Sequence, residues 1–325
     1  MNTTSSVTSP SPTFPVTTTT NQEPECTSKG LFMCGLVALA AFAIAYKNRN
    51  SAGKLQFTKC EKDNPRHFRD YSKISTLTDL KINKTDIGKL HLSGSGQFGA
   101  EHIQTIADLT LMGNRNRELW FVDVRAERHC FVDGKPAVWK RDTEKRNEST
   151  AEVVTAENQL ISKIANKNFT IKQWKGEETQ MTAKVENEKT VVEAAGHNYV
   201  RFPIVEHHIP TDACVDSIVQ FIKSHGQAHL HVHCYVKERS TLVLAMVDML
   251  YNVHEIALSD ITDRAQAIGG TDLFKVSSKR KKHSPELTEE KKKFLWNFYF
   301  YCRDEDPLVK KTAKTWTEWS RLNRK

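Results

Sequence analysis

One segment, residues 230–250 (LHVHCYVKERSTLVLAMVDML), constrains the fold more than any other part of the chain. It has the pattern of an apolar strand, then a cysteine in a short polar loop, then a Ser-Thr step into an apolar helix. In α/β domains such a turn directs backbone N–H groups and the helix N-terminus at one point, where they favour an anion. A phosphate could therefore be held between Cys234 and Arg239, but a buried cysteine between a strand and a helix is, on this segment alone, more often inert packing.

Strand and helix patterns alternate along the chain from about residue 54 onward. Residues 119–124 and 228–233 are apolar enough to be buried strands. Helices are predicted at residues 149–164, 215–224 and 242–251. Residues 168–204 are rich in Thr, Val and alternating charge, which favours a small antiparallel β excursion. We therefore predict an α/β fold, with a central mixed sheet flanked by helices.

The first 46 residues differ in composition from the rest. Residues 1–28 contain 14 Ser or Thr and 4 Pro, so we expect a disordered arm. Residues 30–46 form an uncharged apolar run of 17 residues, the lower limit for crossing a bilayer. Because Lys47 and Arg49 follow that run, we favour a membrane anchor with the domain in the cytoplasm. The alternative is a cleaved signal segment and a secreted or exported product.

The charge is unevenly distributed. The chain has 47 basic and 39 acidic residues, but residues 275–325 alone carry 15 basic and 7 acidic ones, which leaves the remainder balanced at 32 of each. This pattern argues against nucleic acid as a partner and predicts a neutral domain over residues 55–303 followed by a basic tail over 304–325. The seven cysteines form no CxxC pair, so no metal, cofactor or disulfide scaffold is predicted.

Six separated motifs resemble those of the protein-tyrosine-phosphatase-like (PTP-like) inositol polyphosphate phosphatases, the cysteine phytases of bacteria. They occur in the family's order: PRHFR at 65–69, LHLSGSGQF at 90–98, DVRAERHCFVDG at 123–134, RFPIVEHHIP at 201–210, LHVHCYVKERST at 230–241 and DITDRAQAIGGTDL at 260–273. The resemblance runs from about residue 60 to about residue 303. It implies a PTP-like fold and hydrolysis of inositol polyphosphates or another phosphate monoester.

The resemblance also implies roles for individual residues. Cys234 stands at the place of the family's nucleophile, which forms a cysteinyl-phosphate, and Arg239 at that of the arginine that clamps two phosphate oxygens. Glu206 stands at the place of the general acid, an Asp in the family. The resemblance places five further residues in substrate binding: His207, His233, Lys237, Arg69 and Ser240.

The loop departs from the family pattern in length and in composition. The family has five residues between Cys and Arg, two of them glycine, whereas here four residues and no glycine separate Cys234 from Arg239. Glu238 stands where glycine is usual, and a carboxylate there is expected to oppose a phosphate dianion. Two hypotheses therefore stay open: an active cysteine-dependent phosphatase, or a membrane-tethered pseudophosphatase that binds a phosphorylated ligand or protein partner without turnover.

Two further patterns have competing interpretations. His229, His231 and His233 alternate along one strand, and we favour hydrogen-bonded strand histidines over a zinc site. The lysines at 291–293 could extend a phosphate-binding surface, but we favour a solvated helix face.

Overall fold

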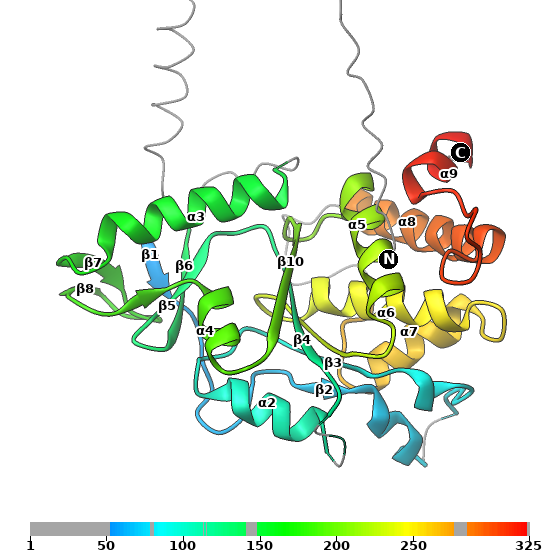
Figure 1. Ribbon diagram of the computed structural model, residues 1–325, viewed down its shortest axis with the longest axis horizontal. Helices are drawn as coiled ribbons and strands as arrows, with labels where there is room; N and C mark the ends of the chain where they lie inside the picture. The colour runs from blue at the N-terminus through cyan, green and yellow to red at the C-terminus, as the bar shows by residue number, and fades with distance from the viewer. Residues whose placement is uncertain are drawn as a thin grey trace, which may run out of the picture. The chain divides into compact units, whose positions relative to one another are not determined.

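A five-stranded mixed sheet forms the centre of the domain in the computed structural model, which describes residues 53–78, 81–112, 114, 116–140, 148–275 and 285–323 (Figure 1). Its strands, in spatial order, are β10 (Asn198–Ile204), β4 (Leu119–Arg125), β11 (His229–His233), β3 (Leu92–Ser95) and β2 (Arg69–Asp70). The first four are parallel, and β2 pairs antiparallel to β3. The predicted α/β fold with a mixed sheet flanked by helices is confirmed.

The central strands are buried on both faces, as strands of a parallel sheet usually are. In β11 every residue is buried, the three histidines included. His231 lies between two serines of β3, with its Nδ1 2.9 Å from Ser93 Oγ and its Nε2 2.9 Å from Ser95 Oγ, and His229 Nε2 contacts Ser93 Oγ at 2.9 Å. His229 and His231 are therefore hydrogen-bonded strand histidines, as we expected.

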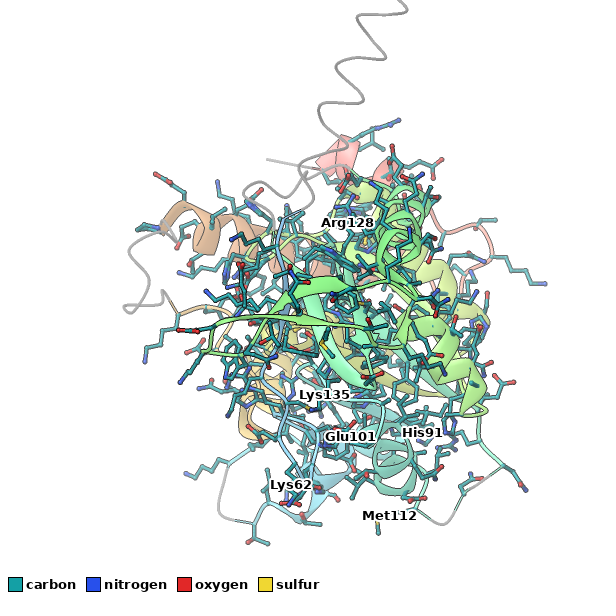
Figure 2. The ribbon with its side chains drawn as sticks, turned by 90° about the vertical axis from the view of Figure 1, so that its left-hand side faces the viewer. Lys62, His91, Glu101, Met112, Arg128 and Lys135 are labelled. Carbon is teal, nitrogen blue, oxygen red and sulfur yellow. The ribbon has the colours of Figure 1, made fainter. Side chains whose placement is uncertain are left out.

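Helices cover both faces of this sheet. The larger core lies on the side of α5 (Asp212–Ser224), α6 (Glu238–Asn252), α7 (Leu258–Ala267), α8 (Pro285–Glu305) and α9 (Trp316–Asn323). On the other face a smaller apolar cluster joins Phe98 and Phe121 to α2 (His102–Thr110) and α4 (Glu188–Ala194). Two short 3-10 helices, η1 (Tyr71–Thr76) and η2 (Ile87–Lys89), follow β2. Figure 2 shows basic and acidic side chains interleaved on the surface, among them Lys62, Glu101 and Lys135.

A second sheet lies beside the first and is larger than the sequence predicted. Its order is β8 (Glu178–Met181), β7 (Phe169–Lys172), β1 (Leu55–Phe57), β6 (Lys135–Trp139), β5 (His129–Val132) and β9 (Val185–Glu186). The predicted excursion at 168–204 contributes the antiparallel hairpin of β7 and β8 and the short β9. The sequence did not predict α4 within that range, nor that β1, β5 and β6 complete the sheet.

The helix α3 (Thr150–Ile164) packs on this second sheet. Its start confirms the helix that the sequence predicted from residue 149 onward. Ser149 Oγ accepts a hydrogen bond from the Glu152 amide at 3.3 Å, and the Glu152 carboxylate accepts one from the Ser149 amide at 2.8 Å. This reciprocal capping box satisfies two N–H groups that the helix geometry leaves without partners. The apolar stripe of α3 contacts the core of the sheet through Leu160 and Ile161.

The stretch predicted as a basic tail contains a packed helix. α9 buries Trp316 and Trp319, and Trp316 Nε1 donates to Asp212 Oδ1 of α5 at 2.8 Å. Aromatic side chains bury a large apolar area, which favours folding this stretch back onto α5 and α8. The helix α9 within residues 304–323 therefore packs against the domain.

The sequence also predicted a membrane anchor at residues 30–46 with the domain in the cytoplasm, and this location is contradicted. Across the described ranges, no helix combines the length and the apolar character needed to cross a bilayer. α6, for example, places its apolar side chains in the domain core. Residues 30–46 lie outside the described residues, as does the predicted disordered arm at 1–28.

Candidate active site

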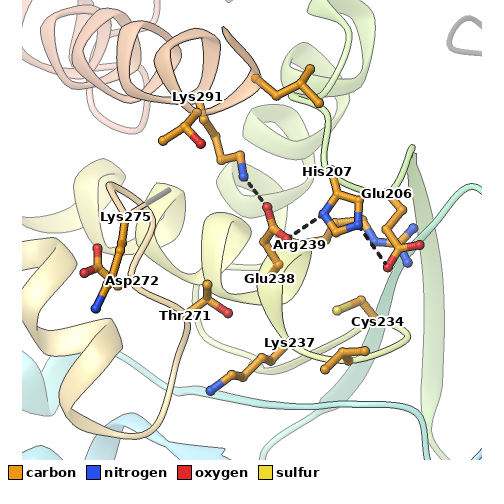
Figure 3. Close-up of a pocket in the computed structure, with 13 residues that line it drawn as sticks. Glu206, His207, Cys234, Lys237, Glu238, Arg239, Thr271, Asp272, Lys275 and Lys291 are labelled. Atoms are coloured by element: carbon orange, nitrogen blue, oxygen red, sulfur yellow. Dashed lines mark hydrogen bonds and ion pairs between the residues drawn. The ribbon is translucent and has the colours of Figure 1, made fainter. Parts of the chain in front are cut away.

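A cavity of about 320 Å³ lies at the C-terminal end of β11, where the loop after the strand turns into α6 (Figure 3). Its lining comes from four parts of the chain: the turn after β10, the 234–239 loop, the stretch after α7, and α8. The lining residues used below are Glu206, His207, Cys234, Lys237, Glu238, Arg239 and Lys291. The C-terminal edge of parallel strands is where α/β folds commonly place their ligand sites.

Cys234 directly follows β11 and is buried beneath the cavity. Its Sγ lies 3.4 Å from Ser240 Oγ, so the hydroxyl of the first α6 turn contacts the sulfur. α6 begins at Glu238, and no side chain caps its N-terminus. The positive end of the helix dipole therefore faces the cavity beside the sulfur, an arrangement that favours an anion.

Arg239 is fixed by a carboxylate that sequence reasoning did not single out. Its Nη1 and Nη2 donate to the two carboxylate oxygens of Glu127 at 2.5 Å each, and Nη1 also donates to the Ile204 carbonyl at 2.8 Å. Burial alone lowers the pKa of Arg239, but the paired Glu127 carboxylate outweighs burial and raises it. The guanidinium therefore remains charged inside the protein with its orientation set.

A buried ionic network lies behind this pair. Arg125 Nε donates to Asp123 at 2.6 Å and its Nη2 to Glu188 at 2.5 Å, while Arg201 Nη1 donates to Glu157 at 2.8 Å. His233 Nε2 contacts Glu188 Oε1 at 2.5 Å. Opposite charges offset each other's burial here, as buried charges require. His233 is thus part of the scaffold behind the loop and does not line the cavity, although the resemblance placed it in substrate binding.

The turn after β10 carries Glu206, which lines the same cavity as Cys234 (Figure 3). It is closed by the His208 amide, which donates to the Val205 carbonyl at 3.1 Å, and His207 occupies its third position with φ 68°. His207 Nδ1 lies 2.8 Å from Glu238 Oε2, and its Nε2 lies 3.4 Å from Glu206 Oε1. Burial lowers the pKa of His207, but the two carboxylates outweigh it and raise the pKa to about 9.

Glu238 is paired with cations. Its carboxylate contacts the His207 imidazole on one side and the Lys291 ammonium on the other. Burial raises the pKa of Glu238, but His207 and Lys291 outweigh it and lower the pKa to about 2. We expected this carboxylate to oppose a phosphate in the loop. In the structure its charge is offset by two neighbouring cations, which reduces that repulsion.

Two predicted cations occupy different environments. Lys237 lines the cavity, and its Nζ donates to the Gly269 carbonyl at 3.1 Å. Arg69, by contrast, is 3% exposed and lies behind the loop. Its guanidinium donates to Ser240 Oγ at 2.6 Å, to Thr241 Oγ1 at 2.8 Å and to the Lys237 carbonyl at 3.3 Å. Arg69 therefore supports the loop, and the expectation that it faces further phosphates does not fit its position.

The structure thus brings five of the predicted residues together at the cavity: Cys234, Arg239, Glu206, His207 and Lys237. Ser240 lies beneath the sulfur. Glu127 was missed, although it lies in one of the quoted motifs. Glu127 could have been considered from the sequence, because a buried arginine such as Arg239 requires a carboxylate partner. Lys291 was considered, but as a solvated face, since nothing in the sequence shows which side of α8 turns inward.

Two groups of side chains in the described residues have the donor types of a metal site. Asp123, His129 and Glu188 are buried, and their carboxylates already pair with Arg125. Cys60, Glu101 and His102 lie on another part of the domain, where His102 Nδ1 accepts the Gly99 amide at 3.1 Å. In both groups, existing contacts occupy ligand atoms that a metal would need.

A parallel-stranded α/β domain with a cysteine after its central strand, and an arginine in the first turn of the next helix, has the architecture of the protein-tyrosine-phosphatase class. Comparison with known proteins indicates which family within this class the chain resembles. Residues 142–251 match the family model of PTP-like phytases, described by the words inositol hexakisphosphate. The resemblance inferred from the six motifs is confirmed by this match.

Solved structures share the fold. A PTP-like myo-inositol phosphatase from Mitsuokella multacida, in complex with myo-inositol-(1,3,4,5)-tetrakisphosphate, superposes with a TM-score of 0.73 at 23% identity, over 83% of this chain and 48% of that one. A PTP-like phytase from Bdellovibrio bacteriovorus gives a TM-score of 0.65 at 23% identity, over 82% of this chain and 94% of the other.

A curated relative matches at the sequence level. The effector protein hopD2 of Pseudomonas syringae pv. tomato is 27% identical over 272 residues, which cover 78% of this chain and 56% of the relative. The chain therefore spans little more than half the length of this relative, and about half that of the Mitsuokella structure.

Proposed function

We propose that the protein is a cysteine-dependent phosphatase that hydrolyses phosphate monoesters, with inositol polyphosphates as its substrates. The observation that carries the proposal is the convergence of three groups on one cavity: the Cys234 sulfur, the Arg239 guanidinium and the Glu206 carboxyl. These are the nucleophile, the oxyanion clamp and the proton donor that hydrolysis through a covalent phosphoenzyme requires.

The geometry of Arg239 supports a phosphate clamp. The described contacts engage both N–H groups of Nη1 and one of Nη2. A guanidinium has five N–H groups, so the edge formed by Nε and the second Nη2 hydrogen remains for another bidentate partner. Arg239 can therefore hold two phosphate oxygens through Nε and Nη2 while Glu127 fixes the adjacent edge formed by Nη1 and Nη2.

The proposed reaction has two steps. First the Cys234 thiolate attacks phosphorus, so that an S–P bond forms while the bond to the leaving oxygen breaks, and Glu206 gives its proton to that oxygen. Water then attacks the cysteinyl-phosphate and the S–P bond breaks. The Glu206 carboxylate takes the proton of that water, which releases phosphate and restores the starting state.

The substrate class is supported by the relatives and by charge. The family model is described by inositol hexakisphosphate, and the Mitsuokella structure holds an inositol tetrakisphosphate. Two of the lysines lining the cavity, Lys237 and Lys275, come from separate loops. Such cations suit a ring that carries several phosphates.

Two variants test the proposal: one should lose phosphatase activity, and the other restores the family's loop pattern. We expect Cys234→Ser to abolish phosphate release from inositol hexakisphosphate while ligand binding persists, because a hydroxyl is a much weaker nucleophile than a thiolate. A second variant inserts glycine between Val236 and Lys237 and changes Glu238→Gly, which restores the family's loop pattern. Binding without turnover in the wild type, with turnover gained in this variant, would assign the natural protein to ligand binding. Folded variants without binding or turnover would overturn the proposal.

A further inference from the structure

Four ionisable side chains, basic and acidic in alternation, lie in a row along one side of the cavity. Lys291 of α8 contacts Glu238, Glu238 contacts His207 Nδ1, and His207 Nε2 faces Glu206 (Figure 3). The row joins α8, the first residue of α6 and the turn after β10, three elements with no chain connection at this point. The last residue of the row, Glu206, is the proton donor in the proposed function.

Exposure is greatest at the Glu206 end of the row. The side chain of Lys291 is 10% exposed, that of His207 15%, that of Glu238 27% and that of Glu206 40%. The three side chains distal to Glu206 are thus shielded from water, where ion pairs are screened less and contribute more than at the surface. Glu206, at the open end, is the member that a bound ligand can reach.

The turn that carries Glu206 needs such support. His207 has φ 68°, a left-handed conformation that costs a residue with a Cβ about 1–3 kcal/mol unless its surroundings stabilise it. Within the turn, the backbone contact is the His208 amide to the Val205 carbonyl. Glu238 supplies a contact from outside the turn, through the His207 ring.

The far end of the row is rigid. α8 is anchored in the main core by Phe294, Leu295 and Phe298, so Lys291 projects from a fixed backbone one turn before them. Glu238 opens α6, whose next residue, Arg239, is itself held by Glu127. A cation and a carboxylate held in this way can therefore fix the position of the turn that contacts them.

We propose that Lys291, Glu238 and His207 form a positioning array that holds Glu206 over the cavity for proton transfer to the leaving oxygen. The inference rests on the proposed function and deepens it, because it gives Glu238 a task in catalysis. None of the three acts on the substrate in this role: they are positioning residues, and Glu206 is the catalytic one.

The array predicts a dependence on the leaving group. A nitrophenolate leaves without protonation, whereas an inositol alkoxide needs the proton of the general acid. We expect Glu238→Gln and Lys291→Met each to lower kcat on inositol hexakisphosphate about tenfold or more, a substantial part of a general-acid contribution. On nitrophenyl phosphate the same variants should change kcat less than about twofold. Lys292→Met is the matched control, since Lys292 pairs with Glu289 and lies outside the cavity lining.

A second measurement needs no turnover. We expect amide hydrogen exchange at residues 205–208 to accelerate in Glu238→Gln and Lys291→Met, and NMR titration of Glu238→Gln to show the His207 pKa falling toward its ordinary value. Lys292→Met should change neither. Equal loss of kcat on both substrates, or unaltered exchange in both variants, would overturn the array. If the wild type hydrolyses neither substrate the proposed function fails, while exchange and titration still decide whether the array holds the turn.

Discussion

Glu127 and Arg239, which are 112 residues apart in sequence, form a two-pronged ion pair with both N···O distances at 2.5 Å. The pair connects the short loop between β4 and β5 to the first turn of α6. It fixes the plane of the guanidinium before any ligand arrives, so the cost of orienting the clamp is met during folding.

Removing the Glu127 charge should therefore affect both stability and activity. We expect Glu127→Gln to lower the free energy of unfolding by about 3–5 kcal/mol, because a buried guanidinium loses its counter-charge. Urea unfolding measures this. Glu193→Gln, an exposed helix position, should change stability by less than about 0.5 kcal/mol. A variant as stable as the wild type would contradict the assigned importance of the pair.

A substitution at Gly96 tests how closely the 234–239 loop approaches the end of β3. A Cβ at this position would lie 2.6 Å from the Val236 carbonyl oxygen and 3.2 Å from that of Arg66, both backbone atoms that cannot move independently. We expect Gly96→Ala to destabilise the domain by about 1–3 kcal/mol and to displace the loop, with loss of phosphatase activity. Gly88→Ala is the control, since no atom lies within 4 Å of its Cβ position. Equal melting temperatures of the two variants would refute this account.

Substitution of Arg69 tests whether this side chain supports the 234–239 loop or binds the substrate. Its three hydrogen bonds hold the Lys237 carbonyl and two hydroxyls of α6, and lysine cannot reproduce that fork. We expect Arg69→Lys to reduce kcat/KM on inositol hexakisphosphate and nitrophenyl phosphate by the same factor. Lys237→Met, at the cavity, should instead affect the polyphosphate more strongly. A selective effect of Arg69→Lys on the polyphosphate would restore its predicted role as a substrate cation.

The His207–Glu238 pair should give stability a definite pH dependence. His207 has its pKa raised from 6.5 to about 9, so its contribution is complete below pH 6.5 and is lost as the pH rises through 9. Glu238 has its pKa lowered from 4.5 to about 2, so its contribution is complete above pH 4.5 and is lost as the pH falls through 2. We expect the difference in unfolding free energy between wild type and His207→Asn to shrink between pH 6.5 and 10. Asparagine tolerates the left-handed turn, so the comparison isolates the charge. A difference independent of pH would contradict it.

The sequence predicted the local features of this domain better than the distant ones. The helix at α3 followed from Ser149 and Glu152, which lie three residues apart, and the loop after β11 followed from adjacent residues. The six-stranded sheet was not predicted, because its β1 pairs with β6 and β7, far along the chain. Pairing between distant strands depends on tertiary packing that no local pattern encodes.

The same distinction applies to the site. Cys234 and Arg239 share one loop, and the motif alone was enough to place them together at the cavity. The partners of Arg69, Arg239 and Glu238 lie far away in sequence, so their pairing could not be inferred from spacing. Glu238 in particular was expected to repel a phosphate. Its two cations, His207 and Lys291, come from elements whose relative positions only the folded chain defines.

The separation between Glu127 and Arg239 also has a kinetic consequence. The strands that position the pair, β4 and β11, are parallel, so an entire crossover must form before they meet. Lys291 reaches the cavity from 53 residues beyond Glu238. Long-range contacts of this kind slow folding, because the entropy of loop closure must be overcome before they form. A nascent chain that has not yet produced α8 would have a cysteine and an arginine but no assembled pocket, so the reactive site should mature late, after most of the domain has left the ribosome.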